Sequence, residues 1–163
     1  CFADIVRLAQ EKGYTEPDPR DDLKGTDFMR KMLILARDAG YVIEAKDVEI
    51  ENILPQVCLD AQSISDFYKE LDASEAHFTE LKNKAKASNK VIRYIGKLEN
   101  GQASISLQMV DEHHPFYTLS GSDNIISFTT ERYKDRPLVV KGPGAGAEVT
   151  AAGVFSDLVN VGA

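Results

Sequence analysis

The sequence is poor in cysteine, tryptophan and basic residues, and each shortage narrows the class of protein. Its 163 residues include two cysteines and no tryptophan. Two cysteines are too few for a disulfide framework, so we expect a reducing, cytoplasmic setting. Lys and Arg number 19 against 26 Asp and Glu, and the formal net charge is −7. Because nucleic acid is bound by basic surfaces, this balance argues against a nucleic-acid partner.

Long apolar runs are also missing. None approaches the ~18 residues that would cross a bilayer, and no signal peptide opens the chain, so we expect no membrane partner. Hydrophobic residues make up 43% and charged residues 28%, as in an ordinary globular domain. The chain starts with Cys1 inside a helical pattern rather than with Met. We therefore expect a piece of a longer protein.

The first quarter of the sequence has two helical patterns separated by a loop. Residues 1–13 have apolar side chains at helical spacing and end in a Lys-Gly pair, which favours a helix stop. Two prolines in residues 14–27 predict a fixed, irregular loop without regular helix. Residues 27–40 form the second pattern, which Thr26 or Asp27 would cap. Its apolar residues cover more than one face, so we expect a buried helix.

Later patterns turn from helical to alternating. Residues 41–54 indicate a strand, and residues 63–88 a helix that breaks near Asp72. Two alternating runs then flank Asn100 and Gly101, a strong hairpin signal.

Strands cluster rather than alternate with helices, which predicts an α+β fold: a mixed β-sheet covered by helices. We expect residues 90–141 to join one sheet with residues 41–54 and to supply a subunit interface. A glycine-rich turn at residues 142–146 opens a C-terminal helix of small residues and is the one candidate boundary.

The loop before the second helix is strongly acidic. It contains five acids and two bases, namely Glu16, Asp18, Asp21, Asp22, Asp27, Arg20 and Lys24. Carboxylates this close repel one another unless a cation lies among them. A solvated loop whose Asp residues cap the next helix would explain the composition. The prolines, however, stiffen the backbone, and a rigid acidic loop suits an ammonium group as ligand.

Asp27 and Lys31 are four residues apart and share a helix face. An ordinary exposed ion pair, worth ~0.3–0.5 kcal/mol, is one explanation. Apolar neighbours on both sides favour a partly buried site instead, where the lysine would donate a proton or bind a carbonyl oxygen. The pattern alone leaves both explanations open.

Two other sets of residues give weaker indications of function. Gly142, Gly144 and Gly146 do not match G-x-G-x-x-G, so tight packing before a helix is the simpler explanation. The three histidines and two distant cysteines lack metal-ligand spacing, and we expect no metal site.

Two strings carry a resemblance to a known family. GYTEPDPRDDLKGTDFMRK at residues 13–31 and GPGAGAEVTAAGVFSDL at residues 142–158 resemble the homoserine dehydrogenase family, most closely the C-terminal part of its bifunctional aspartokinase/homoserine dehydrogenases. A monofunctional enzyme is the other option. The resemblance implies reversible reduction of L-aspartate 4-semialdehyde to L-homoserine with NADP or NAD.

The resemblance also implies an organisation. Residues 1–141 would form the catalytic domain, which binds substrate and dimerises. Residues 142–163 would return to a Rossmann domain that this sequence lacks and that binds most of the coenzyme, with Gly146 as a backbone contact to the nucleotide. A homodimer or higher homo-oligomer is implied, and the isolated chain is expected to be inactive.

Residue roles carry over by motif. Lys31 matches the family's proton donor, and Glu16 matches the residue that binds the substrate's amino group. Asp22 and Asp27 match carboxylates that line the site, and Tyr14 lies beside it. The chemistry is consistent, because an ammonium needs carboxylates and a lysine with a pKa near ~10.4 is protonated at neutral pH. A non-catalytic dimeric amino-acid-binding module, or another reductase of an amino-acid aldehyde, remains the alternative.

Overall fold

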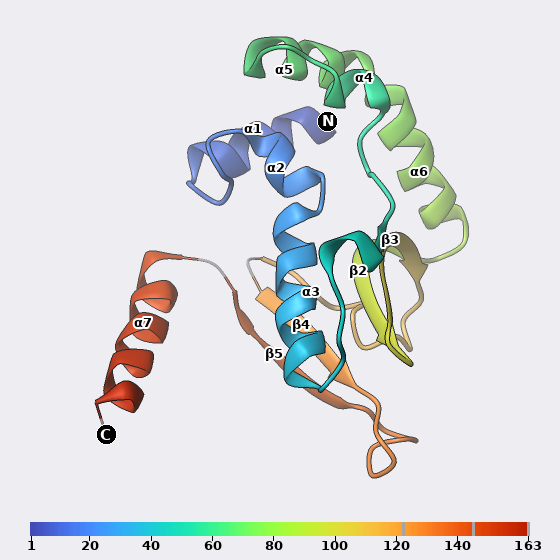
Figure 1. Ribbon diagram of the computed structural model, residues 1–163. Coiled ribbons are helices and arrows are strands. Elements are labelled where there is room, and N and C mark those ends of the chain that lie inside the picture. Colours follow the sequence, from blue (N-terminus) through green and yellow to red (C-terminus); the bar gives the residue numbers. More distant parts are fainter. Residues whose placement is uncertain (122, 145, 163) are drawn as a thin grey trace. The chain divides into compact units, whose positions relative to one another are not determined.

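The chain forms two compact units, Cys1–Val110 and Asp111–Ala163. The computed structural model describes residues 1–121, 123–144 and 146–162 (Figure 1). The candidate boundary at residues 142–146 lies inside the second unit, so the units divide earlier than the glycine-rich turn. The functional division at residue 141 stays a prediction. In the described ranges, every helix is too short or too polar to cross a bilayer.

The first unit contains most of the helices. They are α1 (Phe2–Glu11), α2 (Pro19–Leu23), α3 (Thr26–Asp38), α4 (Gln56–Leu59), α5 (Ile64–Ala73) and α6 (Glu75–Ala87). Helices α1, α4 and α5 enclose one apolar core, whose buried members are Ala3, Val6, Leu54, Cys58, Phe67 and Leu71. The predicted break in residues 63–88 is confirmed at Ser74, which ends α5 and precedes α6.

The loop predicted to be irregular contains the short helix α2. Pro19 stands in its first turn, where the missing N–H would have no helical partner in any case. Asp18 caps α2 by accepting the Arg20 backbone N–H at 3.0 Å. The expected cap of α3 is also wrong: Gly25, with φ of 75°, precedes the helix and Thr26 is its first residue.

A three-stranded mixed sheet completes the first unit. It consists of β1 (Val48–Ile50), β2 (Val91–Glu99) and β3 (Gln102–Val110) in the order β1-β3-β2. The predicted hairpin is confirmed, because β2 and β3 are antiparallel and are joined by Asn100 and Gly101 with φ of 51° and 78°. Residues 41–54 supply only the short β1, parallel to β3, after a 3-10 turn at Ala45–Asp47.

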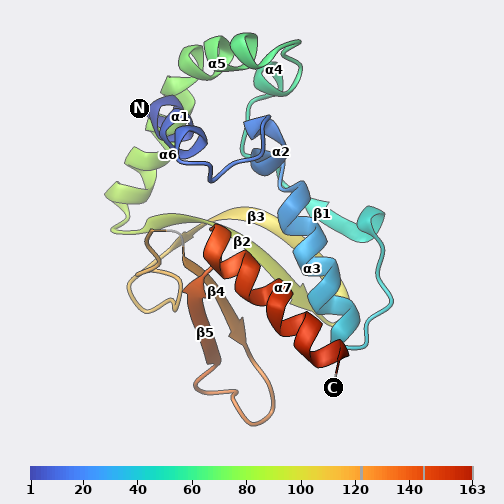
Figure 2. The same cartoon turned by 90° about the vertical axis from the view of Figure 1, so that its left-hand side faces the viewer.

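Helix α3 packs on the hairpin through one face (Figure 2). Met32 and Ala36 are buried in a second core, and a Cβ at Gly96 of β2 would collide with the Met32 sulfur. Ile34 of the same helix is 68% exposed. The expectation of a helix buried all round is therefore wrong for this chain, since apolar residues on its other side have no cover here.

The second unit has its own sheet. Strands β4 (Asp123–Phe128) and β5 (Leu138–Pro143) are antiparallel and pair with each other, not with β1. The expectation of one sheet across residues 41–141 is thus wrong for the described strands, although a mixed α+β architecture is confirmed. The predicted C-terminal helix is confirmed as α7 (Ala147–Val161), but Gly142 and Pro143 of the expected turn belong to β5, and residue 145 lies outside the described residues.

Candidate functional site

The acidic loop between α1 and α3 folds back on itself. Helix α1 ends at Glu11, and Gly13 adopts φ of 69°, which reverses the chain. The Asp22 carboxylate then accepts the Glu16 backbone N–H at 2.9 Å. This hydrogen bond closes residues 16–22 into a ring. Two predicted site residues, Glu16 and Asp22, are therefore held together, with the Glu16 side chain exposed to solvent.

One acid of the loop is already neutralised inside the protein. The Arg20 Nε donates to both Asp18 carboxylate oxygens, at 2.9 and 3.0 Å. These side-chain hydrogen bonds are the main reason that the pKa of Asp18 lies below its usual value. Asp18 is therefore a structural carboxylate. By contrast, the Glu16 side chain is exposed, and the Asp22 carboxylate accepts a backbone N–H. Sequence reasoning counted Arg20 only as a base and missed this partnership.

Two contacts attach the loop to helix α5 and the turn before it. Arg20 Nη1 donates to the Ala61 carbonyl. Gln10 of α1 donates through its amide to the Pro17 carbonyl at 3.1 Å and accepts the Tyr68 hydroxyl at 2.7 Å. The Arg20–Ala61 and Gln10–Tyr68 contacts join residues far apart in sequence, so no local pattern could have predicted them. They fix the loop on the side that faces α5.

The lysine and aspartate of α3 pair as their spacing predicts. Lys31 Nζ lies 2.8 Å from an Asp27 carboxylate oxygen, and the two side chains are 54% and 52% exposed. The pair is therefore half exposed in this chain, not partly buried as its apolar neighbours favoured, because Met32 turns to the hairpin while Lys31 turns away. Among the described residues, no hydrogen bond joins Lys31 to Glu16 or Asp22.

Tyr14 begins the loop and is 54% exposed. Its backbone N–H donates to the Ala9 carbonyl at 3.0 Å, which continues the last turn of α1. Its role beside the site stays a prediction.

Gly146 belongs to the second unit and stands before α7. Its φ of 127° is a conformation that only glycine adopts readily, and a Cβ there would meet no protein atom within 4 Å. Its carbonyl accepts both the backbone N–H and the hydroxyl of Thr150. An open glycine at the N-terminus of a 15-residue helix fits the close approach of an anionic or nucleotide group to the backbone.

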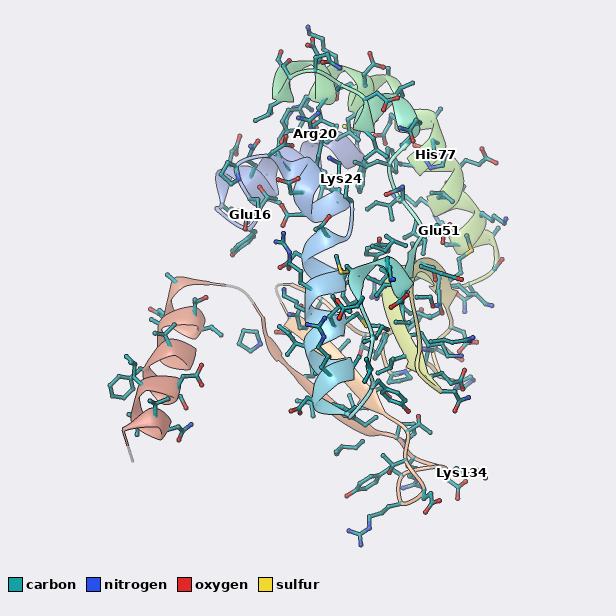
Figure 3. All side chains as sticks on the ribbon, in the orientation of Figure 1. Glu16, Arg20, Lys24, Glu51, His77 and Lys134 are labelled. Atoms are coloured by element: carbon teal, nitrogen blue, oxygen red, sulfur yellow. The ribbon has the colours of Figure 1, made fainter. Side chains whose placement is uncertain are left out.

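Other polar groups serve the fold. In the part of the chain that the structure describes, no three His, Cys, Asp or Glu side chains cluster as metal ligands would. A concave surface between β3 and α6 includes Glu51 and His77 (Figure 3). The Glu51 carboxylate accepts the Leu107 N–H at 3.2 Å and its carbonyl accepts the Tyr94 hydroxyl at 3.1 Å. Glu51 therefore extends the β1–β3 pairing.

The family model described as Homoserine dehydrogenase matches residues 1–159. The chain is 45% identical to bifunctional aspartokinase/homoserine dehydrogenase 2 of Zea mays, over 99% of this chain and 18% of the relative. It is 44% identical to homoserine dehydrogenase of Schizosaccharomyces pombe, over 98% of this chain and 43% of the relative. The chain thus spans less than half the length of these curated relatives.

Solved structures are similar as well. A Candida auris protein described as of unknown function superposes with a TM-score of 0.88 at 42% identity, over 98% of this chain and 45% of that one. Homoserine dehydrogenase of S. aureus superposes with a TM-score of 0.69 at 26% identity, over 99% of this chain and 36% of that one.

Proposed function

The chain belongs to the homoserine dehydrogenase family, and from that premise we propose that it supplies the substrate-binding and proton-donating groups of a homoserine dehydrogenase. The reaction is the reversible reduction of L-aspartate 4-semialdehyde to L-homoserine. One observation carries the proposal: the closed acidic loop at residues 16–22 runs through Gly25 directly into the helix that bears the Lys31–Asp27 pair. Anionic and cationic groups for the two ends of such a substrate therefore come from one continuous segment.

Glu16 and Asp22 bind the substrate's ammonium group. Both have carboxylate side chains, and a charged hydrogen bond to a carboxylate is about twice as strong as a neutral one. Asp22 keeps one oxygen on the Glu16 backbone, which holds the two residues in register. Tyr14, at the mouth of the loop, completes the polar lining.

Lys31 supplies the proton. Hydride addition to the aldehyde carbon leaves negative charge on the oxygen, and a positioned ammonium both stabilises that charge and protonates it. Asp27, 2.8 Å away, orients the lysine. In the oxidative direction the same lysine accepts the hydroxyl proton of homoserine.

Residues at the start of α7 suit a nicotinamide coenzyme, NADP or NAD, which when bound would supply the hydride. Gly146 would contact the nucleotide through its backbone, since a Cβ built on it has none of the described non-neighbouring atoms within 4 Å. Most of the coenzyme would be bound by a Rossmann domain outside this sequence. The 163-residue chain alone is accordingly inactive in this proposal.

The proposed organisation has residues 1–141 as the substrate-binding and dimerising domain and residues 142–163 as the segment that returns to the Rossmann domain. Support for a homodimer or higher oligomer comes from β5, where Leu138, Val139 and Val140 are 44%, 40% and 54% exposed. Apolar strand residues left uncovered mark an interaction surface. We propose a cytoplasmic enzyme with no nucleic-acid or membrane partner.

The test compares two aldehydes in the full-length enzyme. Succinate semialdehyde has the same reacting end as aspartate semialdehyde but lacks the ammonium. Because the acidic loop would be left without its cation, kcat/KM for succinate semialdehyde should be lower by at least ~100-fold. NADPH consumption measures both rates. Glu16→Gln should raise the KM of aspartate semialdehyde and so reduce the difference in kcat/KM between the two aldehydes. Equal rates for the two aldehydes, or binding of aspartate semialdehyde without any NADPH oxidation, would contradict the proposal.

A further inference from the structure

Arg20 makes more contacts than a solvated loop residue requires. We propose that it is the positioning residue of the acidic loop, which holds Glu16 and Asp22 at the spacing that an ammonium ligand needs. This inference rests on the proposed function, because it assigns a device that serves the same site. Arg20 itself does not bind the substrate.

The guanidinium of Arg20 is held on three sides. Its side chain is 14% exposed. One side faces the Asp18 carboxylate, with Nε at 2.9 and 3.0 Å from the two oxygens. Nη1 donates to the Ala61 carbonyl, which belongs to the turn before α5. The third side lies over the ring of the fully buried Phe67, 6.0 Å from the ring centroid.

One of these contacts, the Asp18–Arg20 pair, lies within residues 16–22. The hydrogen bond from the Glu16 backbone to Asp22 closes residues 16–22, and the Asp18–Arg20 pair falls between its ends. The Asp18–Arg20 pair stabilises the ring, and the hydrogen bond to Ala61 attaches the ring to the turn before α5. Loss of Arg20 would remove the ring's contacts with Ala61 and Phe67 and leave the Asp18 charge without its arginine beside the other carboxylates, which repel it.

The position of Arg20 fits an indirect role. Figure 3 shows Arg20 on the side of the loop that faces α5, and Glu16 on the other side. A ligand at Glu16 would therefore meet the carboxylates and not the guanidinium. Arg20 acts on binding through the backbone that it fixes.

Arg7 offers a matched control. It also pairs with a carboxylate, with Nη1 and Nη2 at 3.1 and 2.6 Å from the Asp72 oxygens, and it also lies over an aromatic ring, 4.8 Å from the Tyr68 centroid. Like Arg20 it contacts α5. Unlike Arg20, it forms its side-chain hydrogen bonds with Asp4 and Asp72, outside residues 16–22.

The experiment measures kinetics of Arg20→Gln, Arg20→Lys and Arg7→Gln in the full-length enzyme, with both aldehydes. Loss of charged hydrogen bonds at Arg20 should raise the KM of aspartate semialdehyde about ten- to hundredfold, with a smaller change in kcat. Arg20→Lys should restore part of the affinity, because lysine keeps the charge but not the fork. The KM of the coenzyme and kcat/KM for succinate semialdehyde should not change, and Arg7→Gln should behave as wild type.

Asp18→Asn provides a second test in case the arginine variants do not fold. Asparagine is as good an N-cap as aspartate, so α2 should form, yet the charge that Arg20 pairs with is gone. It should show the same selective rise in KM. A folded Asp18→Asn with unchanged KM, or equal losses for both aldehydes in Arg20→Gln, would overturn the inference. If the wild-type enzyme itself does not distinguish the two aldehydes, the proposed function fails instead.

Discussion

At the scale of single residues, the acids of the loop separate into two groups. Asp18 pairs with Arg20 and caps α2, whereas Asp22 accepts the Glu16 backbone N–H. The excess of acid was visible in the sequence. The separation of these acids into two groups was not visible, because Asp18 and Arg20 are two residues apart and their side chains pair only when α2 begins between them.

The lowered pKa of Asp18 gives a prediction about stability and pH. Since the ionised form is favoured in the folded chain, the pair stabilises it above the unfolded pKa of about 3.9, and this stability is lost as pH falls through the folded pKa. Wild type should therefore be more stable than Asp18→Asn at neutral pH, and the difference should shrink below about pH 4. Urea unfolding at several pH values measures it. A difference that stays constant into strong acid would contradict the pairing.

At the scale of elements, sequence signals within a few residues predicted the turns that depend on those residues alone. Asn100 and Gly101 specified the hairpin because both turn positions require positive φ. Helix α2 was missed because proline was treated as a helix breaker, although its first turn tolerates it. The cap of α3 was misplaced because Gly25 is selected by a distant neighbour, Tyr94, which no local pattern reveals.

Gly25 tests the junction between the loop and α3. Its φ is 75°, and a Cβ would lie 2.5 Å from the Tyr94 hydroxyl oxygen. Gly13 has a similar φ of 69° but open space around it. Gly25→Ala should therefore lower the free energy of unfolding by about 1 kcal/mol more than Gly13→Ala, through overpacking as well as strain.

Tyr94→Phe provides the control for this comparison. Removing the hydroxyl should recover part of the loss in Gly25→Ala and none of the loss in Gly13→Ala. Equal destabilisation by the two alanine substitutions would show that close packing at Gly25 is unimportant.

At the scale of the whole molecule, sequence and structure agree on family and class but not on how the strands associate. Sheet membership depends on contacts between residues far apart, so alternation in residues 124–142 could not show that β4 and β5 pair with each other. The apolar side of α3, with Ile34 68% exposed, had the appearance of a buried helix for the same reason. An amphipathic pattern indicates that one face of a helix is apolar. It does not identify the segment or chain that packs against that face.

The account depends on Lys31 as the group that meets the reacting oxygen. Lys97 is a matched control, because its Nζ lies 2.7 Å from the Glu99 carboxylate and the two side chains are 60% and 63% exposed. An exposed pair contributes at most about 1 kcal/mol, so neither Lys31→Ala nor Lys97→Ala should unfold the protein. The direct measurement is kcat for NADPH-dependent reduction of aspartate semialdehyde by the full-length variants. Lys31→Ala should lower it by about 100- to 10,000-fold, as loss of a proton donor does, while Lys97→Ala leaves it unchanged. Equal turnover in the two variants would contradict the account.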